Sequence, residues 1–103
     1  MRIPAKVDYA VRAMSEMVDR PEPLKAEQLA AAQELPLKYL HSILRDLRHH
    51  RLVVSQRGPD GGFMLARPAE EISLADIFRA IDGPLAEVHD LSLRTIDYRG
   101  PRS

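Results

Sequence analysis

The fold is decided by the stretch Arg57-Gly58-Pro59-Asp60-Gly61-Gly62-Phe63, in which turn-forming residues separate two short apolar segments. Residues 52–56 precede this turn and residues 63–66 follow it, so the sequence predicts a two-stranded hairpin with a Gly-containing loop. Helical patterns precede the hairpin, and this order is typical of a winged helix-turn-helix. A hairpin of this kind can place the Arg57 cation in a DNA minor groove while the helix before it lies in the adjacent major groove.

Three helices are predicted upstream of the hairpin, because apolar residues recur there at three- and four-residue steps. The first spans residues 5–18 and the second residues 25–33, with Pro21 and Pro23 between them preventing a continuous helix. The third spans residues 36–50, since proline suits a first helical position. Its buried stripe is predicted to consist of Leu40, Ile43, Leu44 and Leu47.

A fourth helix is predicted from the Ser73 N-cap to about Ile81, with Asp76 completing a capping pattern. Its apolar face is expected to comprise Leu74, Ile77, Phe78 and Ile81, and the core is expected to include Met14, Met17 and Met64. The predicted fold is mainly α with a small β-hairpin, a winged helix-turn-helix DNA-binding domain over residues 1–84. An extended or poorly ordered tail is expected over residues 85–103.

The charge distribution favours a polyanionic partner. The 103 residues carry no net charge, but residues 36–67 carry six cations and two acids, a net charge of +4. The segments before and after carry −1 and −3. One basic segment between acidic ones is the pattern expected when one face meets phosphate. No stretch approaches the roughly 18 apolar residues of a membrane span, and no secretory signal is visible, so we expect a cytoplasmic protein with no membrane partner.

The exposed face of the third helix supplies hydrogen-bond donors that a major groove can use. It is predicted to carry Lys38, His41, Ser42, Arg45 and His49. A winged helix used for protein contacts is the alternative, and it would show apolar anchors on that face. Metal binding by His41, His49 and His50 is disfavoured, since the adjacent His49 and His50 are expected on different helix faces. No nucleophile or gathered histidine accompanies the carboxylates, so an enzyme is not expected.

Two segments resemble a known family: KVDYAVRAM, residues 6–14, and LPLKYLHSILRDLRHHRLVVSQRGPDGGFMLARPAEEISLADIFRAIDGPL, residues 35–85. They are similar to the IscR/NsrR-type winged-helix regulators of bacteria, also called the Rrf-two family, from residue 1 to about 85. The resemblance implies a sequence-specific transcription factor, usually a dimeric repressor, and we expect it to read a pseudo-palindromic operator. The recognition helix would be residues 36–50 and the wing residues 56–64.

By this resemblance the DNA-binding residues would be Lys38, Tyr39, His41, Ser42, Arg45, Arg57 and Gly58. Arg57 would enter the minor groove, and Tyr39 would brace or contact the DNA backbone. Many family members hold an iron–sulfur cluster through three cysteines, but this chain has none, so we expect the cysteine-free branch with no cofactor or metal. The family's C-terminal dimerisation helix is not predicted after Pro84. The expected partners are double-stranded DNA and a second copy in a full-length homodimer, with dimerisation weakened in this chain.

Overall fold

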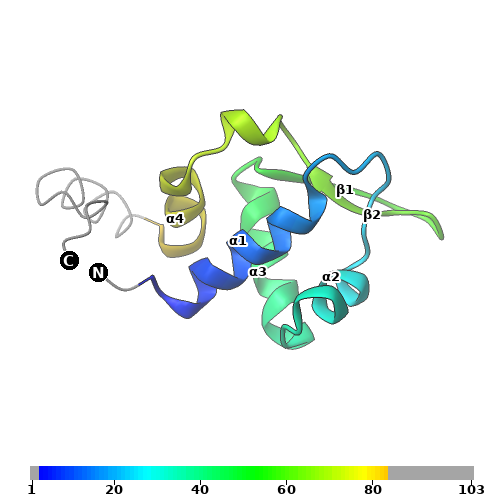
Figure 1. Cartoon of the computed structure of the whole chain (residues 1–103), viewed down its shortest axis with the longest axis horizontal. Coiled ribbons are helices and arrows are strands. Elements are labelled where there is room, and N and C mark those ends of the chain that lie inside the picture. The colour runs from blue at the N-terminus through cyan, green and yellow to red at the C-terminus, as the bar shows by residue number, and fades with distance from the viewer. Residues whose placement is uncertain (1–2, 84–103) are drawn as a thin grey trace, which may run out of the picture.

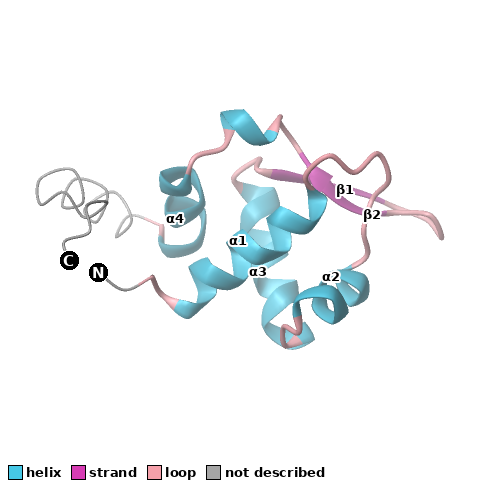
Figure 2. Ribbon diagram, in the orientation of Figure 1, coloured by secondary structure: helices cyan, strands magenta, loops and turns pink. Residues whose placement is uncertain are grey.

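The computed structural model describes residues 3–83, which form a helical body and a projecting hairpin (Figures 1 and 2). The predicted winged helix-turn-helix is confirmed, and the elements follow the predicted order. They are α1 (Ala5–Met17), α2 (Ala26–Gln33), α3 (Leu37–His49), β1 (Val53–Gln56), β2 (Gly62–Leu65), a short 3-10 helix (Ala69–Glu71) and α4 (Leu74–Asp82). No helix within residues 3–83 is long and apolar enough to span a membrane.

Helix α1 lies at the centre of the body and packs against α2, α3, α4 and β2. Its buried face follows the predicted periodicity and consists of Val7, Ala10, Ala13, Met14 and Met17. The four leucine and isoleucine residues predicted as the stripe of α3 are all buried against it. Phe78 of α4 is among the largest buried side chains of this core. The packing leaves the opposite face of α3 free for contacts outside the fold.

Both helices of the helix-turn-helix are followed by a residue other than glycine in the left-handed backbone region. Glu34 follows α2 with φ 54°, and the next N–H, that of Leu35, donates to the Ala30 carbonyl at 2.9 Å. Arg51 follows α3 with φ 62°, and the Leu52 N–H donates to the Leu47 carbonyl at 2.9 Å. This is the Schellman pattern, which ends a helix and turns the chain sharply.

The hairpin pairs β1 with β2 in antiparallel register, with Val53 opposite Leu65 and Gln56 opposite Gly62. The connector between α1 and α2 adds a third extended partner, because Leu24 and Phe63 exchange two backbone hydrogen bonds of 3.0 and 2.7 Å. A Cβ at Gly62 would lie 2.5 Å from the Leu24 carbonyl group, so only glycine fits this approach. Backbone hydrogen bonds therefore hold the wing to the connector, in addition to the packing of β1 against α3.

The Ser73–Asp76 capping box at the start of α4 is confirmed. The Asp76 N–H donates to the Ser73 hydroxyl at 3.0 Å, and the Ser73 N–H donates to the Asp76 carboxylate at 2.9 Å. That backbone hydrogen bond is the largest cause of a lowered Asp76 pKa, to which the Ser73 hydroxyl and the Arg79 guanidinium also contribute against the opposing effect of burial. The carboxylate is therefore favoured in its charged form.

Several details differ from the sequence prediction. Pro36 has φ −65° but ψ 121°, so it caps α3 and the helix starts at Leu37 and ends at His49. Leu74 was predicted to face the core but is 40% exposed, because it lies in the first turn of α4 at the edge of the core. Ala80, which was not predicted to face the core, is buried. Met64 is only half-buried and lies outside the core cluster, because strand alternation turns its neighbours Phe63 and Leu65 toward that cluster. The predicted tail, residues 85–103, lies outside the described residues.

Candidate nucleic-acid interface

The solvent-facing side of α3 carries the donors that the sequence predicts. Lys38, His41 and Arg45 are exposed, and Ser42 between them is half-buried. Tyr39 is 52% exposed beside Lys38, so its phenol hydroxyl is accessible from solvent. Because the buried stripe of α3 consists of Leu40, Ile43, Leu44 and Leu47, these side chains are not part of the core. The face is polar and rich in hydrogen-bond donors, as major-groove recognition requires.

Arg45 has local partners on α3 that leave its guanidinium accessible. Its Nη2 lies 3.5 Å from the Ser42 hydroxyl, and its Nε lies 3.7 Å from the Asp46 carboxylate. The Arg45 side chain is 69% exposed, and exposed ion pairs of this kind contribute little, about 0–1 kcal/mol. An incoming phosphate or guanine edge can therefore compete for this arginine at small cost.

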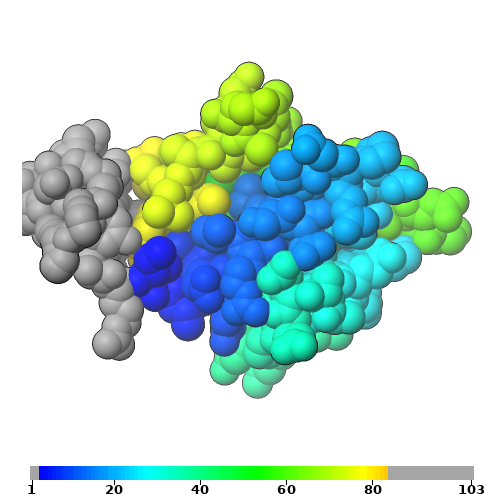
Figure 3. All heavy atoms as spheres, viewed as in Figure 1, coloured from blue at the N-terminus to red at the C-terminus, as the bar shows by residue number. Residues whose placement is uncertain are grey.

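The wing tip holds Arg57 away from the helical body. Gly58 has φ 105°, which favours glycine, and its carbonyl accepts a hydrogen bond from the Gly61 N–H at 3.0 Å, which closes the turn. A Cβ at Gly61 would lie 2.0 Å from the Gln56 carbonyl oxygen, and the Lys25 ammonium lies 3.4 Å from the Gly61 carbonyl. Figures 1 and 3 show this tip protruding at the end of the body opposite α4.

Arginine pairing separates the basic segment from the rest of the molecule. Within residues 3–83, the arginines outside residues 36–67 each form a salt bridge with an acid three or four residues earlier in the chain: Arg12 with Asp8, Arg20 with Glu16 and Arg79 with Asp76. Among the six cations inside residues 36–67, the described structure gives a salt bridge to Arg45 only. All six are exposed. The fold thus keeps a group of exposed cations with few ion-pair partners along α3, the wing and the turns next to them.

Arg48 is a candidate site residue that the sequence singles out only as one of the six cations of residues 36–67. It is exposed in the last turn of α3, and its Nη1 donates to the Ser55 hydroxyl of β1 at 3.3 Å. It follows His41 by seven residues, which places both side chains on the same side of the helix. The seven-residue spacing from His41 could have identified Arg48 from the sequence. The contact with Ser55 could not be predicted in this way, because it depends on how the hairpin packs against α3.

The histidines near the end of α3 do not form a metal site in the described chain. The rings of His49 and His50 meet edge to face with centroids 5.3 Å apart. His50 occupies the C-cap, where the backbone leaves helical geometry, and its Nδ1 lies 3.1 Å from the Asp46 carbonyl oxygen. No group of three metal-ligating side chains occurs within residues 3–83.

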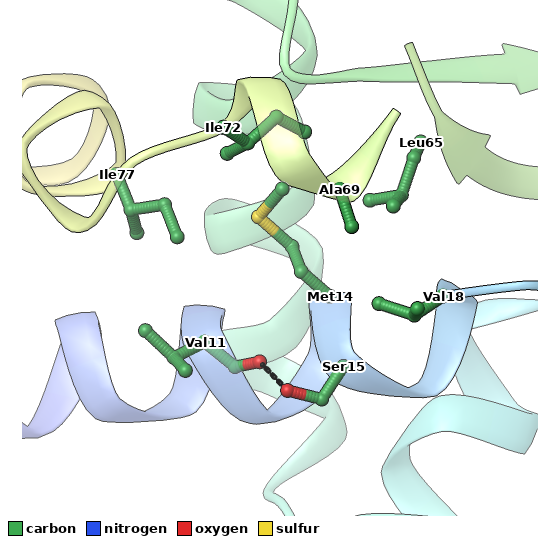
Figure 4. A pocket seen from close by; sticks show the side chains of 8 residues that line it. All are labelled: Val11, Met14, Ser15, Val18, Leu65, Ala69, Ile72 and Ile77. Atoms are coloured by element: carbon green, nitrogen blue, oxygen red, sulfur yellow. Dashed lines mark hydrogen bonds between the residues drawn. The ribbon is translucent and has the colours of Figure 1, made fainter. Parts of the chain in front are cut away.

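An apolar pocket of about 150 Å³ lies on another part of the surface, between α1, the 3-10 helix and the start of α4 (Figure 4). Its lining residues are Val11, Met14, Ser15, Val18, Leu65, Ala69, Ile72 and Ile77. The hydroxyl of Ser15 donates to the Val11 carbonyl at 2.8 Å. No titratable side chain lines this pocket. The pocket is therefore apolar apart from the Ser15 hydroxyl, which is already bonded to the helix backbone.

The fold and the donor-bearing surface define a winged helix-turn-helix protein. The chain matches the model of the Rrf2 family, described as an iron-dependent transcriptional regulator, over residues 3–98. The HTH-type transcriptional regulator Rv1287 of Mycobacterium tuberculosis (strain ATCC 25618 / H37Rv) is 50% identical over 103 residues, covering 98% of this chain and 64% of that relative. The chain belongs to the Rrf2, or Rrf-two, family of transcriptional regulators. It spans less than two thirds of the length of this relative.

Solved structures have the same arrangement of elements. The structure of T. potens IscR superposes with a TM-score of 0.78 at 28% identity and covers 95% of this chain and 78% of that one. CymR (YrzC), the global cysteine regulator of B. subtilis, superposes with a TM-score of 0.74 at 30% identity and covers 82% and 67%. These comparisons confirm the predicted family and fold class.

A cysteine-held iron–sulfur cluster does not fit the donor atoms of this stretch of chain. Iron–sulfur clusters are held mainly by cysteine thiolates, and the sequence contains no cysteine. The described residues bring no three His, Asp or Glu side chains together as ligands.

Proposed function

We propose that the chain is the DNA-binding part of a bacterial transcriptional repressor that reads a pseudo-palindromic operator as a homodimer. The distribution of arginine partners carries this proposal. The described arginines outside the basic segment each pair with a nearby acid, whereas those of α3 and the wing are exposed and, except for Arg45, form no salt bridge in the described chain. A surface built in this way attracts a polyanion and releases its counterions on binding.

In the proposed complex α3 lies in a major groove and the wing lies in the adjacent minor groove. Arg45 is suited to a guanine edge, because its guanidinium can donate two parallel hydrogen bonds to O6 and N7. Lys38 and Tyr39 are suited to phosphate, which positions the protein without reading sequence. Arg57 on the wing is suited to a narrow A/T-rich minor groove, where the negative potential is strongest.

The alternative, a winged helix that binds protein, draws on two exposed apolar side chains. Leu37 is 37% exposed and Val54 is 47% exposed, and both lie beside the proposed interface. Leu37 begins α3 and Val54 lies on β1, so they belong to different elements, whereas Lys38 and Arg45 place donors on α3 itself. Single exposed apolar residues are normal on protein surfaces and do not make an interface core. The donors on α3 therefore favour DNA over a protein as the partner.

The test is fluorescence anisotropy with labelled fragments from upstream of the protein's own gene and with scrambled duplexes, over a range of salt concentrations. We expect preference for one fragment and affinity that falls steeply with salt. Arg45→Ala should reduce discrimination at one base pair per half-site by about 1–3 kcal/mol, and Lys38→Ala should weaken all duplexes alike. Absence of binding to every duplex, or equal losses for both variants on all DNA, would refute the proposal.

The remaining parts of the proposal concern assembly and setting. We propose that the regulator works in the bacterial cytoplasm, where the chromosome lies, and without a cysteine-held cluster in this stretch of chain. Light scattering on the free and DNA-bound protein tests the homodimer, because two half-sites on a pseudo-palindrome require two copies. A mass corresponding to one copy on a complete operator would contradict this assembly.

A further inference from the structure

The corner between α3 and the wing contains a cation whose hydrogen-bonding capacity is largely unused. Arg48 donates one hydrogen bond, of 3.3 Å, to the Ser55 hydroxyl, and it forms no salt bridge within residues 3–83. A guanidinium has five N–H donors in a planar fork, so most of them remain available. The Ser55 hydroxyl accepts from Arg48, and its own proton remains free to be donated elsewhere.

The position of this pair is set by elements that leave little freedom. Arg48 lies in the last turn of α3, and Ser55 is the third residue of β1, which packs against α3. The Schellman turn at Arg51 connects the two elements and directs β1 away from the helix end (Figure 1). The Arg48–Ser55 pair therefore lies at the corner where α3, which carries Arg45, meets β1, which leads to Arg57.

We propose that Arg48, oriented by Ser55, binds the phosphate of the DNA strand that separates the major groove from the adjacent minor groove. This inference rests on the proposed function. If α3 occupies one groove and the wing the next, a sugar–phosphate strand must pass between them, across the corner where Arg48 lies. The guanidinium fork matches phosphate oxygens through two parallel N–H donors, and the Ser55 proton supplies a third. Arg48 is thus a positioning residue that sets how α3 and the wing sit on the duplex.

The experiment compares wild type, Arg48→Ala, Arg48→Lys and Ser55→Ala on the preferred duplex and on a scrambled duplex. Arg48→Ala should lose about tenfold in affinity on both duplexes, as expected for a charged hydrogen bond, and should lower the slope of log affinity against log salt by about 0.9. Arg48→Lys should restore the slope but only part of the affinity, because lysine lacks the fork. Ser55→Ala should lose about two- to fivefold, as a neutral hydrogen bond would.

Lys6→Ala is the matched control, since it removes one exposed charge at the start of α1, far along the body from the wing (Figure 1). It should leave affinity nearly unchanged. Melting temperatures of all variants should equal that of wild type, because each altered side chain is exposed. This comparison separates loss of a phosphate contact from loss of folded protein.

Duplexes with one neutral methylphosphonate at each position in turn locate the contact. Wild type should lose affinity at the phosphate on the groove boundary, and Arg48→Ala should be insensitive to that same change, which shows that the two groups interact. Failure of wild type to bind any duplex would refute the proposed function itself. Binding by wild type together with an Arg48→Ala affinity equal to that of Lys6→Ala, or with undiminished sensitivity at every phosphate, would overturn the phosphate contact and leave the proposed function standing.

Discussion

Replacing Arg51 by glycine is expected to stabilise the protein. Arg51 has φ 62° at the end of α3, where its N–H donates to the Arg48 carbonyl at 3.0 Å and the next N–H donates to Leu47 at 2.9 Å. These hydrogen bonds belong to the backbone, so glycine preserves them. The Arg51 side chain is exposed and forms no salt bridge within the described residues, so little packing or pairing is lost.

The size of the effect follows from two opposing contributions. A residue with a Cβ pays about 1–2 kcal/mol to adopt the left-handed conformation. Glycine removes this cost. It also gives the unfolded chain more conformational freedom, which lowers the free energy of unfolding by about 0.4–1 kcal/mol. The net gain in free energy of unfolding should be about 0.5–1 kcal/mol. For a domain of this size, 1 kcal/mol corresponds to roughly 4–8 °C in melting temperature.

Urea and thermal unfolding followed by circular dichroism would measure this difference. All variants should be compared at one protein concentration, because self-association makes the melting temperature concentration-dependent. Arg51→Ala is the matched control, since it removes the same charge but keeps the Cβ and should give no gain. Equal stability of the glycine and alanine variants, or a loss in the glycine variant, would show that the left-handed turn is not strained. Glu34→Gly should behave like Arg51→Gly, because Glu34 has φ 54° at the end of α2.

Three further predictions concern the wing, the capping box and the DNA contact. Gly62→Ala should lower the free energy of unfolding by about 1–3 kcal/mol more than Gly58→Ala does. Both glycines have positive φ, but of the two only Gly62 would place a Cβ against backbone atoms. Equal losses for the two variants in urea titrations would show that this close approach is unimportant. The lowered Asp76 pKa means that its stabilising contribution is present above the unfolded-state pKa and is lost as pH falls through the folded-state value. The Asp76→Asn variant should therefore lose less stability than wild type as the pH falls. Identical pH profiles of unfolding for the two proteins would contradict a contribution of the Asp76 charge to the cap. Arg57→Ala should weaken DNA binding most when the flank is A/T-rich, and an effect independent of flank in anisotropy titrations would exclude minor-groove binding by the wing.

Local sequence patterns predicted most of the fold because they report directly on local physics. The apolar spacing of α1 and α3 identified their buried faces, and the Gly/Pro turn at residues 57–62 identified the wing. Ser73 and Asp76 predicted a cap that the hydrogen bonds confirm. The exposure of Lys38 and Arg45 was predicted in the same way, whereas their contacts with bases or phosphate stay a prediction.

The features that were missed depend on contacts between distant segments. The pairing of Leu24 with Phe63 joins residues far apart in the chain, and Leu24 has no local strand pattern between Pro23 and α2. The left-handed turn at Arg51 is hidden because arginine carries no signal for positive φ. Met64 was placed inside because it is apolar, although the strand alternation that buries Phe63 and Leu65 turns it elsewhere.

The bonding of Leu24 to Phe63 gives the connector between α1 and α2 a part in setting the spacing of the proposed DNA contacts. The connector runs from the end of α1 to the start of α2, so its length fixes where the wing's second strand is anchored relative to the helix-turn-helix. Lengthening or shortening it by one residue would shift Arg57 relative to Arg45 without altering either side chain. In regulators built on this plan, the length of this loop is therefore one determinant of the distance between the two proposed DNA contacts.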